Sequence, residues 1–298
     1  MRLRFNQENN SQRHFPSRTL LALAGLAPLF NLGCSSLLYY PSSQFFVAPS
    51  KIPYRPEELK IQTEDGLDLV AWSFRAPRPK KDAPLLLFFH GNAQNVSAHF
   101  VGLYWILDHG YDFTILDYRG YGGSEGDPSP QGTVQDGSAF FRWAEAKYPR
   151  RPKVIFAQSL GGAIALRALS ENRSWFHPQL IVIEASFKSY RAAGVSALAK
   201  SAWTWPFQWL AHLVLSDAHA PNEERIRSLS PTPIIVVHSK DDPVIDLRLG
   251  KDLFEAAGEP KEFWETTGDH INAFQGKDST LRRRLLERLA KPPLPHPQ

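Results

Sequence analysis

Ser159 stands at the junction of an apolar, strand-like run and a helix-like run, between small residues. The strand-like run is Val154 to Phe156, and the residues two positions either side of the serine are Ala157 and Gly161. A turn this sharp exposes a serine as a nucleophile, because only small neighbours let the strand and the helix pack so closely. Many ordinary strand-to-helix turns satisfy so short a pattern, so its meaning depends on the other polar groups of the chain.

A serine hydroxyl is a poor nucleophile near neutral pH, so it needs an imidazole that takes its proton and a carboxylate that orients the imidazole. Later strand-like runs end in such groups, first the neighbouring acids Asp241 and Asp242 and then His270. We therefore predict a triad in the chain order serine, aspartate, histidine, with Ser159 as the nucleophile and His270 as the general base. His238, which precedes the two acids, carries little meaning alone.

An acyl-transfer site also needs two N–H donors for the oxyanion, and the loss of one donor typically costs roughly 3 kcal/mol of transition-state stabilisation. We predict that Leu160, directly after the serine, provides one backbone N–H and that Asn92 provides the other. Asn92 follows the buried, strand-like run Leu85 to Phe89, and Gly91 permits an unusual backbone there. We interpret His90 in this loop as a hydrogen-bonded scaffold residue and not as a general base.

The sequence predicts no cofactor and no metal. The glycine-rich stretch from Asp117 to Gly126 satisfies neither glycine pattern of the nucleotide-binding loops, and we interpret Asp117 and Arg119 within it as a structural ion pair. The chain has a single cysteine and no His-Glu-x-x-His motif, so it contains no recognisable set of metal ligands.

The elements that must position these groups follow the pattern of an α/β protein. Two alternating runs around Glu64-Asp65-Gly66 predict an antiparallel hairpin. Continuously apolar strands then alternate with helical stretches, which predicts a mostly parallel sheet with helices on both faces and ligands at the carboxyl ends of its strands. We expect strands at 85–89, 113–116, 154–156, 180–183, 234–237 and 262–266, and helices at about 96–108, 133–147 and 280–290.

Residues 187–226 interrupt this alternation and predict a small cap of short helices over the strand ends. The segment is rich in aromatic residues, including Trp203, Trp205 and Trp209. Two interpretations are open: an aromatic cluster that simply packs on the domain, and a cap that forms an apolar site for the substrate.

The first 33 residues have the features of a targeting signal. A polar, basic stretch leads into an apolar run from Leu20 to Leu32, which is short for a membrane span but suits a signal peptide. Cys34 follows and is the only cysteine, so no intramolecular disulfide is possible. This arrangement resembles the bacterial lipoprotein signal, which implies lipidation of Cys34 and a membrane-anchored catalytic domain outside the cytoplasm, in the cell envelope. An uncleaved N-terminal anchor and an ordinary buried cysteine are the alternatives.

The basic character of the chain belongs largely to this leader. Without it the chain loses four of its 34 basic residues and one of its 30 acidic residues, and the net charge falls from +4 to +1. No nucleic-acid partner is therefore expected. Residues 34–58 are rich in proline and aromatic residues, so we expect an irregular tether there. We expect the folded domain at 59–291 and a disordered tail at 292–298.

Five stretches resemble the α/β-hydrolase superfamily: HGNAQN at 90–95, DYRGYGGSEG at 117–126, AQSLGG at 157–162, HSKDDPVI at 238–245 and GDHINAF at 268–274. More narrowly, they resemble its membrane-anchored serine hydrolases, a branch of bacterial anchored proteins and depalmitoylase-like proteins. The resemblance implies an α/β-hydrolase fold and makes Asp242, in the Asp-x-Val motif, the acid of the triad. Glu184, at the end of an earlier strand, is the alternative acid. The chain departs from the family at Ala157 and Ser239, where the family has glycine, and neither change removes a catalytic group.

These observations lead to the hypothesis of a serine hydrolase that cleaves carboxylic esters or thioesters through an acyl-enzyme on Ser159. Its expected partners are a small-molecule or acylated substrate and, through the N-terminal lipid or anchor, a membrane. Two alternatives are kept. One is a non-catalytic binding or scaffolding protein on the same fold. The other is an aminopeptidase-type amidase, which would need a cluster of carboxylates for the substrate amine.

Overall fold

The computed structural model describes residues 38–200, 203–275 and 280–291. The predicted signal peptide, Cys34 and the predicted C-terminal tail lie outside the described residues. Among the residues that are described, none of the helices has the length and apolar character needed to cross a membrane.

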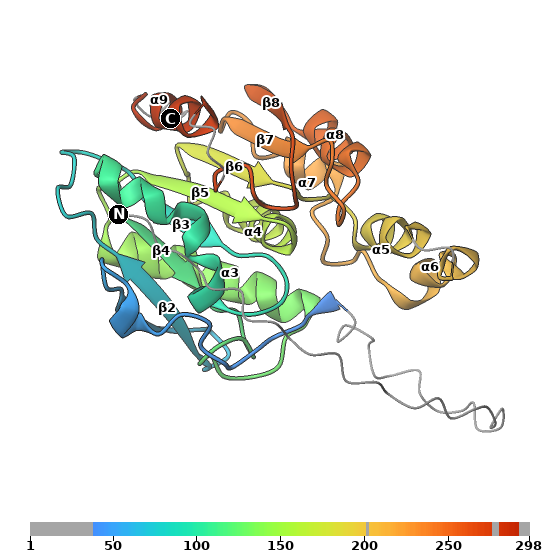
Figure 1. The fold of residues 1–298 in the computed structure, drawn as a ribbon, viewed down its shortest axis with the longest axis horizontal. Coiled ribbons are helices and arrows are strands. Elements are labelled where there is room, and N and C mark those ends of the chain that lie inside the picture. Colours follow the sequence, from blue (N-terminus) through green and yellow to red (C-terminus); the bar gives the residue numbers. More distant parts are fainter. Residues whose placement is uncertain (1–37, 201–202, 276–279, 292–298) are drawn as a thin grey trace. The chain divides into compact units, whose positions relative to one another are not determined.

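An eight-stranded, mostly parallel sheet forms the centre of the described domain (Figure 1). Its strand order is β1-β2-β4-β3-β5-β6-β7-β8, in which β2 is antiparallel to both of its neighbours and all other neighbours are parallel. The predicted sheet with its N-terminal antiparallel hairpin is therefore confirmed. The strands are β1 (Glu57–Gln62), β2 (Asp68–Phe74), β3 (Leu85–Phe89), β4 (Phe113–Leu116), β5 (Lys153–Gln158), β6 (Leu180–Glu184), β7 (Ile234–Ser239) and β8 (Lys261–Thr266).

Helices cover both faces of this sheet. The α-helices of the described residues are α1 (Val96–His99), α2 (Val101–Tyr104), α3 (Pro130–Lys147), α4 (Leu160–Asn172), α5 (Tyr190–Ala199), α6 (Leu210–Val214), α7 (Glu223–Arg227), α8 (Leu247–Ala256) and α9 (Thr280–Leu289). Short 3-10 helices lie at Pro49–Lys51, Trp105–His109 and Trp205–Phe207.

Two apolar cores result, one on each face, because successive side chains of a strand point to opposite sides. In β3, Leu87 belongs to the core shared with α3, α4 and α8, whereas Phe88 belongs to the core shared with α2 and α9. All five residues of β3 are buried, as the continuous apolar run predicts. This two-sided packing fixes the carboxyl ends of β3, β5, β6 and β7, where the predicted site residues lie.

The predicted helix at about 96–108 is the clearest departure from the expected fold. The structure divides it into α1, α2 and the 3-10 helix Trp105–His109. Gly102 brings this segment close to the strand that precedes Ser159, since a Cβ atom at Gly102 would lie 3.2 Å from Nε2 of Gln158. Helix α8 is an addition that the sequence patterns did not reveal. Its start is marked by Asp246, whose side chain accepts the backbone N–H of Arg248.

The insertion between β6 and β7 consists of short helices, as the interrupted pattern predicts. Helices α5 and α6 and the 3-10 helix Trp205–Phe207 belong to it, and α7 leads back toward β7. Figure 1 shows α5 and α6, in yellow, at the end of the sheet to which the arrow of β5 points.

Candidate active site

Ser159 occupies the turn between β5 and α4 in a strained backbone conformation. Its φ is 52° and its ψ is −122°, values that a residue with a side chain rarely adopts. The small neighbours are needed for the reason predicted: a side chain at Gly161 would collide with the backbone carbonyl groups of Phe89 and His90. Ala157 is fully buried in β5, so its additional methyl group is accommodated. The local geometry is that of a nucleophile elbow.

Asp242 and His270 form a hydrogen-bonded pair. The distance between Asp242 Oδ2 and His270 Nδ1 is 2.7 Å, and Asp242 Oδ1 accepts the backbone N–H groups of Val244 and Ile245. Burial raises the pKa of Asp242, but the hydrogen bonds from His270 and from the two N–H groups more than offset this, so the pKa lies below its usual value. The carboxylate is therefore ionised at neutral pH and is suited to orient an imidazole.

His270 presents Nε2 as its remaining ring nitrogen, because Nδ1 is engaged by Asp242. Among the described residues, no hydrogen bond joins His270 to the hydroxyl of Ser159. Hydrogen bonds of this kind are often long before substrate binds. Asp241, the other candidate of the acid pair, is exposed and contacts the N–H of Gly268 at 3.4 Å. The structure therefore brings Asp242, and not Asp241, to His270.

Glu184, the alternative acid, has a different set of partners. Its carboxylate accepts Nε2 of Gln158 at 2.7 Å and the backbone N–H of Ala273 at 2.8 Å. Its backbone carbonyl also accepts the N–H of Ser159 at 2.9 Å. Burial raises the pKa of Glu184, and these hydrogen bonds oppose that effect. Glu184 thus connects the turn of Ser159 with the loop of His270, a role that sequence reasoning missed.

The loop after β3 lies directly beside Ser159, since a Cβ atom at Gly91 would lie 3.4 Å from Cβ of Ser159. The backbone N–H of Ala93 is taken by the side chain of Asn92 at 2.7 Å. The N–H of Ala93 is therefore engaged, and the backbone N–H of Asn92 is the group in this loop that we predict to donate to the oxyanion. Leu160 is the first residue of α4, so its backbone N–H has no acceptor within the helix. The roles of Asn92 and Leu160 stay predictions.

His99 supports this loop and was not singled out from the sequence. Its Nε2 lies 3.1 Å from the carbonyl oxygen of Ala93, a residue held at a φ of 64°. Burial lowers the pKa of His99 to about 3, and the neighbouring His90 and His270 act in the same direction. The imidazole is therefore neutral and serves as a hydrogen-bond donor to the loop. Only its position in α1, four residues after the cap Asn95, connects it with the loop in the sequence.

The predicted ion pair between Asp117 and Arg119 is wrong. Asp117 lies 3.4 Å from Nε2 of the fully buried His90, whereas Arg119 contacts Asp136 at 2.8 Å and Asp65 at 3.0 Å. The chain enters a turn directly after β4, and Gly120 in this turn has a φ of 78°. The side chains of Asp117 and Arg119 therefore point in different directions. The burial of His90 and its contact with Asp117 suit the scaffold role assigned to it.

Ser239, a departure from the family pattern, links the acid loop with the histidine loop. Its hydroxyl donates to the carbonyl oxygen of Gly268 at 2.5 Å and accepts the N–H of Asp241 at 3.1 Å. His238 is fully buried and lies 3.6 Å from Asp242 Oδ2. Both residues therefore stabilise the loop that carries Asp242.

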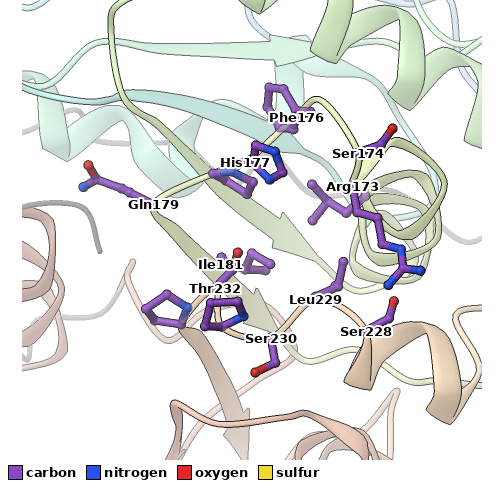
Figure 2. Close-up of a pocket in the computed structure, with 14 residues that line it drawn as sticks. Arg173, Ser174, Phe176, His177, Gln179, Ile181, Ser228, Leu229, Ser230 and Thr232 are labelled. Atoms are coloured by element: carbon purple, nitrogen blue, oxygen red, sulfur yellow. The ribbon is translucent and has the colours of Figure 1, made fainter. Parts of the chain in front are cut away.

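Among the described residues, no group of three or more His, Cys, Asp or Glu side chains is placed to hold a metal ion. A cavity of about 350 Å³ is found elsewhere, at the edge of the sheet where β6 and β7 begin (Figure 2). Arg173, His177 and Ser230 line it. Because Ser159 follows the carboxyl end of β5, this cavity is separate from the candidate active site.

Comparison with known proteins agrees with the geometry. The family model described as "Serine aminopeptidase, S33" matches residues 80–230. The uncharacterized protein YfhR of Salmonella typhi is 28% identical over 258 residues, which cover 82% of this chain and 84% of that protein. Lysophosphatidylserine lipase ABHD12 of Danio rerio is 28% identical over 226 residues, which cover 67% of this chain and 58% of that protein.

Solved structures share the fold at low sequence identity. The esterase Pf2001 of Pyrococcus furiosus has a TM-score of 0.65 and 19% identity, over 85% of this chain and 96% of its own. The alpha/beta hydrolase GrgF of Penicillium has a TM-score of 0.58 and 18% identity, over 78% of this chain and 97% of its own. The expected α/β-hydrolase fold is thereby confirmed.

Proposed function

This chain belongs to the α/β hydrolases, in the family described as serine aminopeptidase, and we propose that it is a serine hydrolase that cleaves carboxylic esters or thioesters. The observation that carries the proposal is the 2.7 Å hydrogen bond between Asp242 and His270, at the same sheet edge as the strained Ser159. A buried, ionised aspartate that holds a histidine is the arrangement that activates a serine. A lipase among the relatives and an esterase among the structures of the same fold favour ester-type substrates.

In the proposed reaction, Oγ of Ser159 attacks the carbonyl carbon while Nε2 of His270 takes the hydroxyl proton. The N–H groups of Leu160 and Asn92 donate to the oxyanion of the tetrahedral intermediate. His270 then gives the proton to the leaving alkoxide or thiolate, which departs as the C–O or C–S bond breaks. A water molecule, deprotonated by His270, then attacks the acyl carbon. The bond from that carbon to Oγ of Ser159 breaks, His270 returns the proton to Oγ, and the acid is released. Asp242 stabilises the imidazolium in each step.

Replacement of the nucleophile tests this proposal. We expect Ser159→Ala to abolish labelling by a fluorophosphonate probe and to lower the hydrolysis of p-nitrophenyl esters by at least about a thousandfold. Ser174→Ala, at the opposite edge of the sheet, is the matched control and should retain full labelling and activity. Undiminished labelling of Ser159→Ala would exclude Ser159 as the nucleophile, and a folded wild-type protein without labelling or hydrolysis would favour a non-catalytic binding role.

The alternative substrate class is an N-terminal amino-acid amide, in keeping with the family description. Two further acids lie in the loops of the triad, Asp241 and Asp269, and both are exposed. Comparison of kcat/KM for short-chain esters and for amino-acid p-nitroanilides separates the two classes. A higher kcat/KM for the esters supports the proposal, and a higher value for the anilides with a free amino group contradicts it. Anchoring through Cys34 stays a separate prediction.

A further inference from the structure

The helical insertion exposes bulky apolar side chains to water. Trp203 is 89% exposed and Leu213 is 74% exposed. Scattered single exposed apolar residues are ordinary, but several within twelve residues of chain form a patch that usually marks an interaction site. We call this the cap surface, and its exposed apolar members are Trp203, Trp205, Phe207, Trp209, Leu213 and Val214.

The packing of α6 explains why these side chains face outward. Its contact with α5 is close at one glycine: a Cβ atom at Gly194 would lie 3.3 Å from Cβ of Ala211 and closer still to the side chain of Leu215. Ala211 and Leu215 are buried, whereas Trp209 and Leu213, four residues apart on another side of the helix, are exposed. A cap that only covers a site would bury its largest apolar residues. Between residues 203 and 214, however, Ala211 is buried while three tryptophans are exposed.

The composition of the cap surface identifies the kind of partner. Residues 203–214 contain no aspartate, glutamate, lysine or arginine, and Lys200 precedes them. Of the other basic residues near α5, Lys188 lies 3.9 Å from Glu223, and the backbone N–H of Arg191 donates to Asp217. Tryptophan prefers the boundary between lipid and water, because its ring is apolar and its indole N–H is a donor. Basic side chains add attraction to anionic headgroups. An apolar, tryptophan-rich surface that has no acidic residue and is preceded by Lys200 therefore fits a bilayer that contains anionic phospholipids.

Lys200, three residues before Trp203 in the chain, contacts the acid loop of the candidate active site. Its Nζ lies 3.5 Å from the backbone carbonyl oxygen of Asp242. We propose that residues 203–214 dock on an anionic phospholipid bilayer. The proposal concerns binding alone, so it is independent of the proposed reaction and of any lipid on Cys34.

Quenching of tryptophan emission by brominated acyl chains tests the docking directly, because it acts only over short distances. The full chain is mixed with vesicles of phosphatidylcholine, with or without phosphatidylglycerol, whose acyl chains are brominated or not. Residues 1–33 contain no tryptophan, so the leader does not contribute to the signal. We expect quenching of the wild-type protein that increases with phosphatidylglycerol content and decreases with added salt.

Matched variants assign the signal to the cap surface. Trp205→Phe combined with Trp209→Phe keeps the apolar surface and should lose at least half of the quenching. Trp175→Phe, which removes a 40% exposed tryptophan outside the insertion, should keep it. Trp209→Ser combined with Leu213→Ser should weaken the binding of vesicles at least about tenfold, because two large apolar side chains no longer enter the lipid. All these side chains are exposed, so the fold should be retained.

Two outcomes would overturn the proposal. The first is quenching that is absent, or that is equal in the wild-type protein and in the double phenylalanine variant. The second is a wild-type protein that sediments as a dimer without lipid and is not quenched, while the double serine variant sediments as a monomer. That result would identify a second copy of the chain as the occupant of the cap surface.

Discussion

At the scale of single residues, we expect the alignment of Ser159 with His270 to depend on Glu184, a carboxylate outside the predicted triad. Glu184 accepts hydrogen bonds from Gln158, the residue before the serine, and from Ala273, three residues after the histidine. Buried carboxylates that accept two such bonds fix the position of their donors. We therefore expect Glu184 to act as a positioning residue, whereas Asp242 is the acid that contacts the imidazole of His270.

Glu184→Gln is the substitution that tests this role. An amide of the same size presents one oxygen and one NH2 group, so one of the two donors, Gln158 Nε2 or the Ala273 N–H, meets another donor. We expect kcat for ester hydrolysis to fall by about tenfold to a hundredfold with little change of KM, because the reacting groups are misaligned. Glu265→Gln, at an exposed carboxylate, is the control. An unchanged kcat in Glu184→Gln would show that Glu184 has no positioning role.

The triad candidates were accessible from the sequence because each follows a strand, and the carboxyl ends of parallel strands meet at one edge. The partners of Glu184 were not accessible, because they depend on β5 and β6 being neighbours and on the return of the histidine loop. The same limit explains the wrong pair of Asp117 and Arg119: closeness in sequence did not reveal that His90 and Asp136 lie within reach.

At the scale of elements, the predicted tether is part of the fold and supports the loop after β3, which carries Asn92. Asn95 caps α1 through the N–H of Ser97, and its Nδ2 donates to the carbonyl groups of Ser42 and Gln44 at 2.7 and 2.8 Å. Tyr39 in the same segment is buried. The segment before β1 is thus fastened to the loop that carries Asn92.

We expect Asn95→Ala to lower the free energy of unfolding by roughly 2 kcal/mol, since it removes a helix cap and two further hydrogen bonds. It should also lower kcat, because the loop loses its attachment. Asn222→Ala is the matched control, since Asn222 caps α7 through the N–H of Arg225. That variant should lose about 1 kcal/mol and keep its kcat. Denaturant unfolding and ester hydrolysis measure both quantities, and equal kcat values in the two variants would contradict the role of the segment.

The strands of the sheet were predictable because runs buried on both faces are continuously apolar, as in β3 and β4. The division of the helical segment after Asn95 was not predictable. Its sequence pattern is helical through Gly102, but the close approach of Gly102 to Gln158 divides the segment. Helix α8 was missed because Gly250 stands in the middle of its pattern; a side chain there would collide with the ring of His238. In both cases a close approach between distant segments decided the local structure.

At the scale of the whole molecule, buried ionisable groups at one edge of the sheet make stability depend on pH in opposite directions. The pKa of Glu184 is raised, so the folded protein binds this proton more readily and gains stability as the pH falls through that pKa. The pKa of Asp242 is lowered, so its contribution is lost as the pH falls. Only a comparison of variants isolates one group.

His99 allows the sharpest comparison, because its pKa is lowered from 6.5 to about 3. Below pH 6.5 the unfolded chain binds a proton that the folded protein does not, so stability falls by about 1.4 kcal/mol per pH unit until the pH approaches the folded pKa. His99→Gln keeps a donor for the Ala93 carbonyl and removes the titrating group. The free energy of unfolding is measured with denaturant between pH 6 and pH 4. We expect its decrease per pH unit to be smaller in this variant than in the wild-type protein by about 1.4 kcal/mol. Equal slopes in the two proteins would mean that His99 is protonated in the folded state.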